Sequence, residues 1–294
     1  MSTLQDIAAY IGKATGEPFE LHVRSSVAGG CINDTQVLAD AKGRRYFVKI
    51  NEAARLDMFE AEADGLREIL SSGAIRAPHP VVTGIAGGSA FLVLEYLNLR
   101  GGRVDDARLG RELAAMHRHE QVRFGWSRDN TIGSTPQHNA PMDDWLVFWR
   151  EHRLGFQLQL AAQRGYGGKL QKRGERLMAV LENYFVGYRP KASLLHGDLW
   201  SGNYGSLSDG TPVLFDPAVY YGDREVDLAM TELFGGFSPA FYAAYGESYP
   251  LDPGYNTRRT LYNLYHILNH LNLFGGGYLG QSERMLDTLL TEMR

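Results

Sequence analysis

The residues with the clearest chemical potential lie in one octet, His-Gly-Asp-Leu-Trp-Ser-Gly-Asn, at positions 196–203. Asp198 stands five positions before Asn203, which is the spacing found in the catalytic loop of kinases. In such a loop the aspartate reaches the hydroxyl that accepts a phosphoryl group, and the asparagine oxygen binds a metal ion on the phosphates. The octet therefore predicts phosphoryl transfer, with Asp198 as the catalytic residue and Asn203 as a metal ligand.

A second carboxylate follows at the end of the apolar run 213–215. Asp216 occupies the place where kinases have their second metal-binding aspartate, although Pro217 and Ala218 follow it here instead of Phe and Gly. The alternative is that Asp198 and Asp216 only cap turns at strand ends. The order Asp, Asn, Asp favours the phosphoryl-transfer hypothesis and predicts Asp216 as the second metal ligand.

An upstream lysine, Lys49, ends the strand-like run Phe-Val-Lys and could pair with the α- and β-phosphates of a nucleotide. Glu60 and Glu62 lie on the predicted helix that follows, and either could hold the lysine in place. Residues two apart cannot share a helix face, and the apolar face of this helix favours Glu62. A lone lysine or glutamate would instead be read as a solvated surface charge.

Two glycines before Lys49, Gly29 and Gly30, lie between predicted strands, where a turn could cover the phosphates. Glycine lets backbone N–H groups approach a triphosphate closely. No Gly-Lys-Ser/Thr sequence is present, so this is not a Walker A motif. Further along, the backbone between Glu95 and Leu97 is predicted by its position to hydrogen-bond an adenine edge.

The first hundred residues have the pattern of a small, mostly antiparallel sheet after a short helix-like start. Apolar residues spaced three or four positions apart predict one inserted helix over 52–70. A turn-rich connection at 40–43 predicts a hairpin between its flanking strands. The predicted strands cover residues 19–27, 35–39, 45–50, 81–82 and 91–94.

Beyond the glycine pair at 101–102 the pattern is mainly helical, which predicts a hinge and a second lobe. The sequence therefore predicts an α+β protein with two lobes. Residues 1–97 would form an N-terminal nucleotide-binding lobe, and residues 98–294 a C-terminal helical catalytic and acceptor-binding lobe. The predicted helices cover residues 105–119, 142–163, 168–186, 224–246, 256–273 and 280–293, and short apolar runs at 193–195 and 212–215 interrupt them.

Composition excludes several classes of function. The 294 residues include 30 Lys+Arg and 34 Asp+Glu, so the net charge of −4 gives no basic surplus for binding nucleic acid. No apolar run approaches the ~20 residues needed to span a membrane. The first residues show no export signal, which predicts a cytoplasmic protein. The single cysteine, Cys31, cannot form an intrachain disulfide.

On these motifs the chain resembles the fructosamine kinase (ketosamine-3-kinase) family. These enzymes are relatives of aminoglycoside and choline kinases and have a protein-kinase-like fold. The octet in combination with the later Asp-Pro-Ala and Phe-Gly-Gly-Phe segments is specific to the family, whereas His-Gly-Asp alone marks the wider superfamily. The resemblance covers nearly the whole chain and rests on residues 29–31, 47–49, 58–62, 130–133, 195–203, 216–218, 221–225 and 233–237.

The resemblance implies ATP- and Mg²⁺-dependent phosphorylation of the sugar 3-hydroxyl of a ketoamine, the adduct of a sugar and an amine. Fructosamines, ribulosamines and erythrulosamines are the implied acceptors, as small molecules or bound to proteins, and the implied role is deglycation. By the same resemblance, Asp198 would be the base or would orient the hydroxyl, and Asn203 and Asp216 would bind Mg²⁺. Lys49, held by Glu62, would grip the ATP phosphates.

Two residues near these motifs have open interpretations. Trp200 could stack on the sugar or the ketoamine stem, or could be a core aromatic that seals the loop. Cys31 could simply fit a tight turn, in which case a monomer is expected. Alternatively it could link two subunits into a redox-dependent homodimer.

Other functions remain possible at this point. A kinase of the same fold could act on an aminoglycoside, choline or another amino alcohol, because the phosphoryl machinery does not name the acceptor. A non-catalytic nucleotide-binding protein is less expected, because the lysine, the base and both metal ligands are present. A metal-dependent hydrolase would leave Lys49 unexplained. Several other polar and aromatic residues favour packing or hydrogen bonding over metal binding: His117, His119, His266, His270, Trp145, Phe148 and Trp149.

Overall fold

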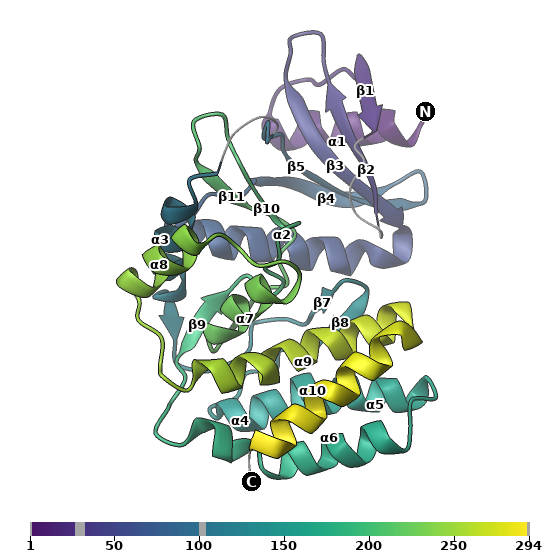
Figure 1. The fold of residues 1–294 in the computed structure, drawn as a ribbon. Helices are drawn as coiled ribbons and strands as arrows, with labels where there is room; N and C mark the ends of the chain where they lie inside the picture. Colours follow the sequence, from purple (N-terminus) through teal and green to yellow (C-terminus); the bar gives the residue numbers. More distant parts are fainter. Residues whose placement is uncertain (1, 27–32, 100–103, 293–294) are drawn as a thin grey trace. The chain divides into compact units, whose positions relative to one another are not determined.

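The computed structural model describes residues 2–26, 33–99 and 104–292 (Figure 1). The chain divides into two compact units. The first contains Met1–Asp105 and Tyr204–Pro217, and the second contains Asp106–Asn203 and Ala218–Arg294. The predicted lobes 1–97 and 98–294 were continuous segments, whereas the chain here returns to the first unit after Asn203.

The first unit is built on a five-stranded sheet in which every neighbouring pair is antiparallel. The predicted hairpin is present between the second and third strands, where Asp40 accepts the backbone N–H groups of Lys42 and Arg44. The first strand begins at Val23, later than the predicted start at residue 19, and the predicted end at residue 27 lies outside the described residues. In spatial order the strands are β1 (Val23–Ser26), β2 (Asp34–Ala39), β3 (Arg45–Glu52), β5 (Ser89–Glu95) and β4 (Pro80–Ala86).

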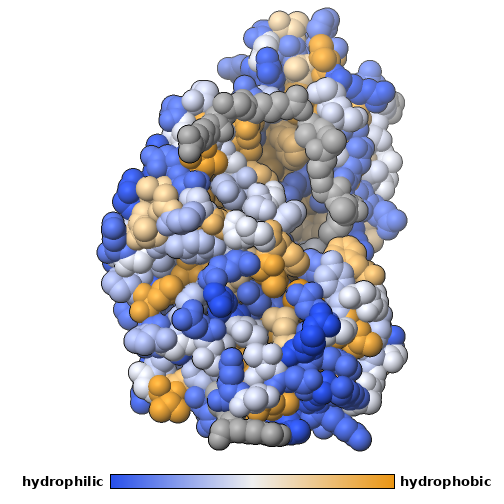
Figure 2. Space-filling model, viewed as in Figure 1, coloured by the Kyte–Doolittle hydropathy of each residue, from blue (hydrophilic) through white to orange (hydrophobic). Residues whose placement is uncertain are grey.

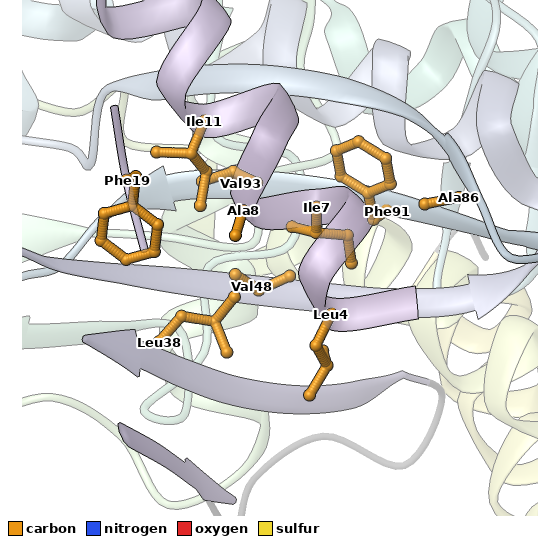
Figure 3. Close-up of a cluster of buried hydrophobic side chains, with 10 residues drawn as sticks. All are labelled: Leu4, Ile7, Ala8, Ile11, Phe19, Leu38, Val48, Ala86, Phe91 and Val93. Carbon is orange, nitrogen blue, oxygen red and sulfur yellow. The ribbon is translucent and has the colours of Figure 1, made fainter. Parts of the chain in front are cut away.

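A helix packs against each face of this sheet. The expected helix-like start is α1 (Thr3–Thr15), which begins with a capping box at Ser2 and buries its apolar side against the sheet. Figure 3 shows its side chains pointing at those of the strands. The inserted helix, α2 (Leu56–Ser71), follows the short 3₁₀ turn η1 (Ala53–Arg55) and contacts β5 and the edge strand β4. The core beneath α1 contains Leu4, Ile7, Ala8, Ile11, Phe19, Leu38, Val48, Ala86, Phe91 and Val93.

The hairpin formed by β10 (Tyr204–Ser206) and β11 (Pro212–Leu214) also belongs to the first unit. Its second strand is joined to the segment after α2, because the backbone N–H of Leu214 donates to the carbonyl of Arg76 at 2.9 Å. Strand β11 was predicted from its apolar run. Asp216 directly follows this hairpin and lies in the first unit.

The second unit is mainly helical, as predicted. The expected helix over 142–163 is one continuous run that contains a π-helical stretch, η2 (Trp149–Gly155). Its remaining helices and 3₁₀ turns are α3 (Asp106–His117), α4 (Trp145–Phe148), α5 (Phe156–Gln163), α6 (Lys169–Ala179), η3 (Leu181–Phe185), α7 (Glu225–Leu233), α8 (Pro239–Ser248), α9 (Tyr255–Phe274), η4 (Gly276–Tyr278) and α10 (Leu279–Glu292).

The expected single helix over 224–246 is wrong, because the structure has two helices, α7 and α8, in this region. Gly235 and Gly236 have φ values of 110° and 68°, which no right-handed helix contains. Ser238 then caps a new helix by accepting the N–H of Phe241, and Pro239 occupies its first turn. Local backbone chemistry therefore overrides the apolar periodicity.

Short strands in the second unit position its loops. The three-stranded sheet has the order β12 (Tyr220–Gly222), β9 (Ala192–Leu195) and β6 (Glu120–Gln121), and a separate hairpin joins β7 (Asn130–Ile132) to β8 (Thr135–Gln137). Strand β9 is fully buried and runs directly into the octet. The α+β prediction, with a small antiparallel sheet followed by a helical region, is confirmed.

In the part of the chain that the structure describes, no helix combines the length and apolar character needed to cross a membrane. On the face drawn in Figure 2, hydrophilic residues are widespread and hydrophobic ones form small separate groups.

Candidate active site

The lysine of the first unit is held by two carboxylates. The side chain of Val48 faces the core beneath α1, so strand alternation turns Lys49 toward the opposite face, where α2 lies. The Lys49 Nζ donates to Oε1 of Glu62 and to Oδ1 of Asp216, each at 2.6 Å. The lysine side chain is 5% exposed. The structure therefore gives Glu62, rather than Glu60, the contact with Lys49.

Burial and charge oppose each other within this group. Burial disfavours the ammonium ion and by itself would lower the pKa of Lys49, but Asp216 and Glu62 outweigh it and raise that pKa. Burial together with the charge of Asp216 raises the pKa of Glu62, which Lys49 partly offsets. The lysine is thus a fixed cation, suited to bind phosphate oxygens.

Asp216 has an unusual backbone conformation. Its φ of 56° makes it the one non-glycine residue with a left-handed backbone among the residues described. Aspartate tolerates this conformation better than most residues, and such conformations gather at functional sites. The side chain is 45% exposed, so a carboxylate that contacts Lys49 also faces solvent.

The octet of the second unit is anchored by a buried carboxylate. Asp227 on α7 accepts the backbone N–H of His196 at 2.7 Å and that of Gly197 at 2.9 Å. Gly197 has a φ of 83°, and a Cβ at this position would lie 2.0 Å from the carbonyl oxygen of Ala218, so only glycine fits. These contacts fix the backbone just before Asp198.

Asn203 closes the loop on Asp198. Its amide nitrogen donates to the backbone oxygen of Asp198 at 2.8 Å and to that residue's Oδ2 at 3.3 Å. The nitrogen is thereby used within the loop, and the amide oxygen lies on the other side of the group. Oxygen is the ligand atom that Mg²⁺ requires, so Asn203 and the carboxylate of Asp216 have the right chemistry for that ion.

The structure describes no group of three or more His, Cys, Asp or Glu side chains, within the ranges given above, that could hold a metal ion by themselves. Mg²⁺ in nucleotide sites usually takes only one or two protein ligands and completes its coordination with phosphates and water. The two oxygen donors predicted from the sequence agree with that usage, and their role as ligands stays a prediction.

Trp200 is not a buried core residue, since 39% of its side chain is exposed. Its ring lies against the backbone of Gly202, where an added Cβ would come within 2.3 Å of the indole. Glycine at that position leaves room for the ring on the loop that carries Asp198. Contact between this indole and a sugar stays a prediction.

The structure describes only some of the residues that are predicted to contact the nucleotide. Gly29, Gly30 and Cys31 lie outside the described residues. The backbone N–H of Glu95 donates to the carbonyl of His79 at 2.8 Å, so this amide is already used within the sheet. The predicted adenine contact would therefore rest on the Glu95 carbonyl and on Leu97, and it stays a prediction.

The remaining candidates have packing or hydrogen-bonding roles. Trp145 and Phe148 stack at 5.6 Å between centroids, and both are buried together with Trp149. The imidazole of His270 donates through Nδ1 to the carbonyl of His266 at 2.8 Å. Both agree with the packing and hydrogen-bonding interpretation favoured from the sequence.

Sequence reasoning missed Asp227, although it is the residue that holds the catalytic loop. It lies in the first turn of α7, where an acidic residue is common because it suits the helix dipole, so its type carried no special signal. Its buried partner His117 was assigned only a structural role. A buried carboxylate that binds backbone amides becomes visible only once the fold brings α7 beneath β9.

A small antiparallel sheet with a buried lysine–glutamate pair and an anchored His-Gly-Asp loop define the class as a phosphotransferase with a protein-kinase-like fold. The chain belongs to the fructosamine kinase family, whose sequence model matches residues 3–292.

Individual relatives agree with this assignment. The chain is 50% identical over 289 residues to a protein of Synechocystis assigned as a ketoamine kinase, covering 97% of this chain and 96% of that one. It is 42% identical to the chloroplastic protein-ribulosamine 3-kinase of Oryza sativa subsp. indica, covering 92% and 79% of the two chains. A crystal structure from Haemophilus somnus, assigned as a fructosamine-3-kinase, superposes with a TM-score of 0.88 at 29% identity and covers 97% and 96%.

Proposed function

We propose that this protein uses ATP and Mg²⁺ to phosphorylate the 3-hydroxyl of the sugar in ketoamines. The observation that carries the proposal is the Asp198 loop, anchored by Asp227, in a chain that matches proteins named ketoamine kinase and ribulosamine 3-kinase over nearly all of its residues. Ribulosamines and fructosamines, free or bound to proteins, are the proposed acceptors.

The proposed step is an in-line transfer. The 3-hydroxyl oxygen forms a bond to the γ-phosphorus of ATP while the bond to the ADP oxygen breaks, and Asp198 takes the hydroxyl proton. Lys49 binds the α- and β-phosphate oxygens as a fixed cation, and Glu62 holds it there. Mg²⁺, when bound, would neutralise phosphate charge, and Asn203 and Asp216 are its proposed ligands. Positioning and charge supply most of the rate.

The position of Trp200 suits the acceptor. A half-exposed indole two residues after the base offers an apolar surface on which a sugar ring or the carbon stem of a ketoamine can lie. A deglycation role follows from this chemistry, because the 3-phosphorylated adduct would be prone to lose its amine. The cytoplasmic location, and a monomer or a homodimer linked through Cys31, stay predictions.

The test is ADP release by the purified, reduced protein with Mg²⁺-ATP. The acceptor panel contains a ribulosamine, a fructosamine, choline and an aminoglycoside, with Asp198→Ala as the inactive control. We expect turnover with the ketoamines only. Turnover with choline or the aminoglycoside alone would make the acceptor assignment wrong, and nucleotide binding without turnover on any acceptor would favour a non-catalytic protein.

A further inference from the structure

A buried histidine next to the catalytic loop has no part in the mechanism above. His117 is the last residue of α3 and is fully buried. Its Nε2 lies 3.1 Å from Oδ2 of Asp227, and its Nδ1 lies 2.8 Å from the hydroxyl of Tyr245 on α8. The histidine therefore connects the carboxylate that anchors the octet to helix α8.

The direction of each hydrogen bond follows from donor chemistry. The carboxylate of Asp227 already accepts two backbone N–H groups, and an ionised carboxylate can only accept, so His117 must present an N–H at Nε2. Burial lowers the pKa of His117, which keeps the ring neutral and leaves Nδ1 as an acceptor. Tyr245 must then donate its hydroxyl proton to Nδ1.

The chain of donors begins at a guanidinium. Nη1 of Arg224 donates to the Tyr245 hydroxyl at 3.0 Å, and arginine has only donors to offer. Arg224 is itself held by the backbone carbonyls of Tyr249 and Pro250 at the end of α8. Each hydrogen bond from Arg224 through Tyr245 and His117 to Asp227 thus has one defined donor and one defined acceptor.

This chain fixes the rotation of the Asp227 carboxylate. Oδ1 receives the N–H of Gly197, and Oδ2 receives both the N–H of His196 and the imidazole of His117. The carboxylate could turn about its last bond if the imidazole contact were lost. The amides that it holds lie one and two residues before Asp198, so such a turn would displace the proposed base.

The geometry points to His117 as a positioning residue for phosphoryl transfer, which acts as the neutral Nε2–H tautomer selected by Tyr245 and orients Asp227 beneath the catalytic loop. The inference rests on the proposed function, since it assigns Asp198 as the base. A misplacement of about 1 Å at a reacting group can cost about 100-fold in rate.

The test compares His117→Leu, which removes the donor, with His117→Gln, whose amide nitrogen can replace Nε2. We expect His117→Leu to lower kcat on a ketoamine by about 10- to 100-fold. The affinity for ATP measured without acceptor should stay within about twofold. His117→Gln should recover most of the kcat. A folded His117→Leu protein with wild-type kcat would overturn the inference, because a purely structural role lowers only the unfolding temperature.

Nuclear magnetic resonance gives a readout that does not depend on the acceptor. In the wild type we expect a pyrrole-like ¹⁵N shift at Nε2 of His117 and a pyridine-like shift at Nδ1, with that preference lost in Tyr245→Phe. The backbone amide signals of His196 and Gly197 should move in His117→Leu and return in His117→Gln. The opposite tautomer would overturn the inference even if the proposed acceptor proved wrong.

Discussion

At the scale of single residues, each of the two units holds one charged side chain in a fixed position. Lys49 is buried between two carboxylates, which makes it a cation that cannot turn away from its site. Two hydrogen bonds hold Asp198 in place. Asp227 accepts the backbone N–H of Gly197, the residue before Asp198, and the side-chain amide of Asn203 donates to the backbone oxygen of Asp198 itself. Each arrangement predicts a different effect of mutation.

Replacing the lysine should separate stability from activity. Lys49→Met leaves Glu62 buried without its cation, and breaking a buried ion pair in this way costs about 3–5 kcal/mol. The double variant Lys49→Met/Glu62→Gln removes the unpaired charge, so it should regain most of that stability and remain inactive. Thermal unfolding by circular dichroism and ADP release measure the two effects. Equal stability in the two variants would contradict the buried pair.

Replacing the base should affect turnover alone. Asp198→Asn keeps the shape of the side chain and removes its ability to take a proton, so we expect kcat to fall about 100- to 10,000-fold. ATP affinity, measured by titration, should change little. Asp143→Asn is the matched control, because its side chain is 84% exposed and pairs with Arg123 on the surface. Turnover retained in Asp198→Asn would refute the assigned role.

At the scale of elements, helices α3 and α8 approach closely at a glycine. An added Cβ at Gly110 would lie 2.4 Å from the carbonyl oxygen of Phe241 and 3.0 Å from the backbone nitrogen of Tyr245. Backbone atoms cannot give way as a flexible side chain can. The same two helices carry His117 and Tyr245, so their spacing also sets the hydrogen bonds that reach Asp227.

Gly110→Ala should therefore destabilise the second unit by about 1–3 kcal/mol through overpacking. Gly246→Ala is the matched control in α8, because an added Cβ there meets no atom within 4 Å. It should be neutral or stabilising, since alanine favours a helix. Urea unfolding followed by tryptophan fluorescence is the measurement, because Trp126, Trp145, Trp149 and Trp200 all lie in the second unit. Equal stability of the two variants would contradict the close approach.

The elements also show how far the sequence could predict this protein. Strand patterns and helical periodicity predicted a small antiparallel sheet, α2 and most helices. The spacing of Asp198 and Asn203 predicted a catalytic loop, and the structure brings these two side chains together. The split between α7 and α8 was missed, because two glycines and a serine cap outweighed an apolar pattern that continues through them. Asp227 and Tyr245 could not be predicted, because their roles depend on contacts between helices far apart in sequence.

At the scale of the whole molecule, stability should depend on pH through buried histidines. His266 is 1% exposed, and neither of its ring nitrogens has a hydrogen-bond partner among the described residues. Burial, with a smaller contribution from His270, lowers the pKa of His266 to about 3. The unfolded chain protonates this ring near pH 6.5, whereas the folded chain does not. The stabilising contribution is therefore complete above pH 6.5 and is lost as the pH falls toward 3.

The free energy of unfolding should accordingly fall by up to about 1.4 kcal/mol per pH unit below pH 6 on account of His266 alone. His266→Asn cannot titrate, so its slope between pH 6 and pH 4.5 should be smaller by about that amount. The slopes of the two proteins above pH 7 should agree and serve as the control. Urea unfolding by tryptophan fluorescence at each pH gives the comparison. Identical slopes below pH 6 would mean that His266 binds a proton in the folded state.

The proposed reaction places a phosphoryl group on the 3-hydroxyl of a ketoamine. The most direct measurement is a ³¹P–¹H correlation spectrum of the product formed from a ribulosamine with Mg²⁺-ATP, with Asp198→Asn as the control. We expect a phosphorus signal coupled to the proton on carbon 3, absent from the control. A phosphorus signal coupled to any other sugar proton, or no phosphorylated ketoamine from an active, ATP-binding protein, would contradict it.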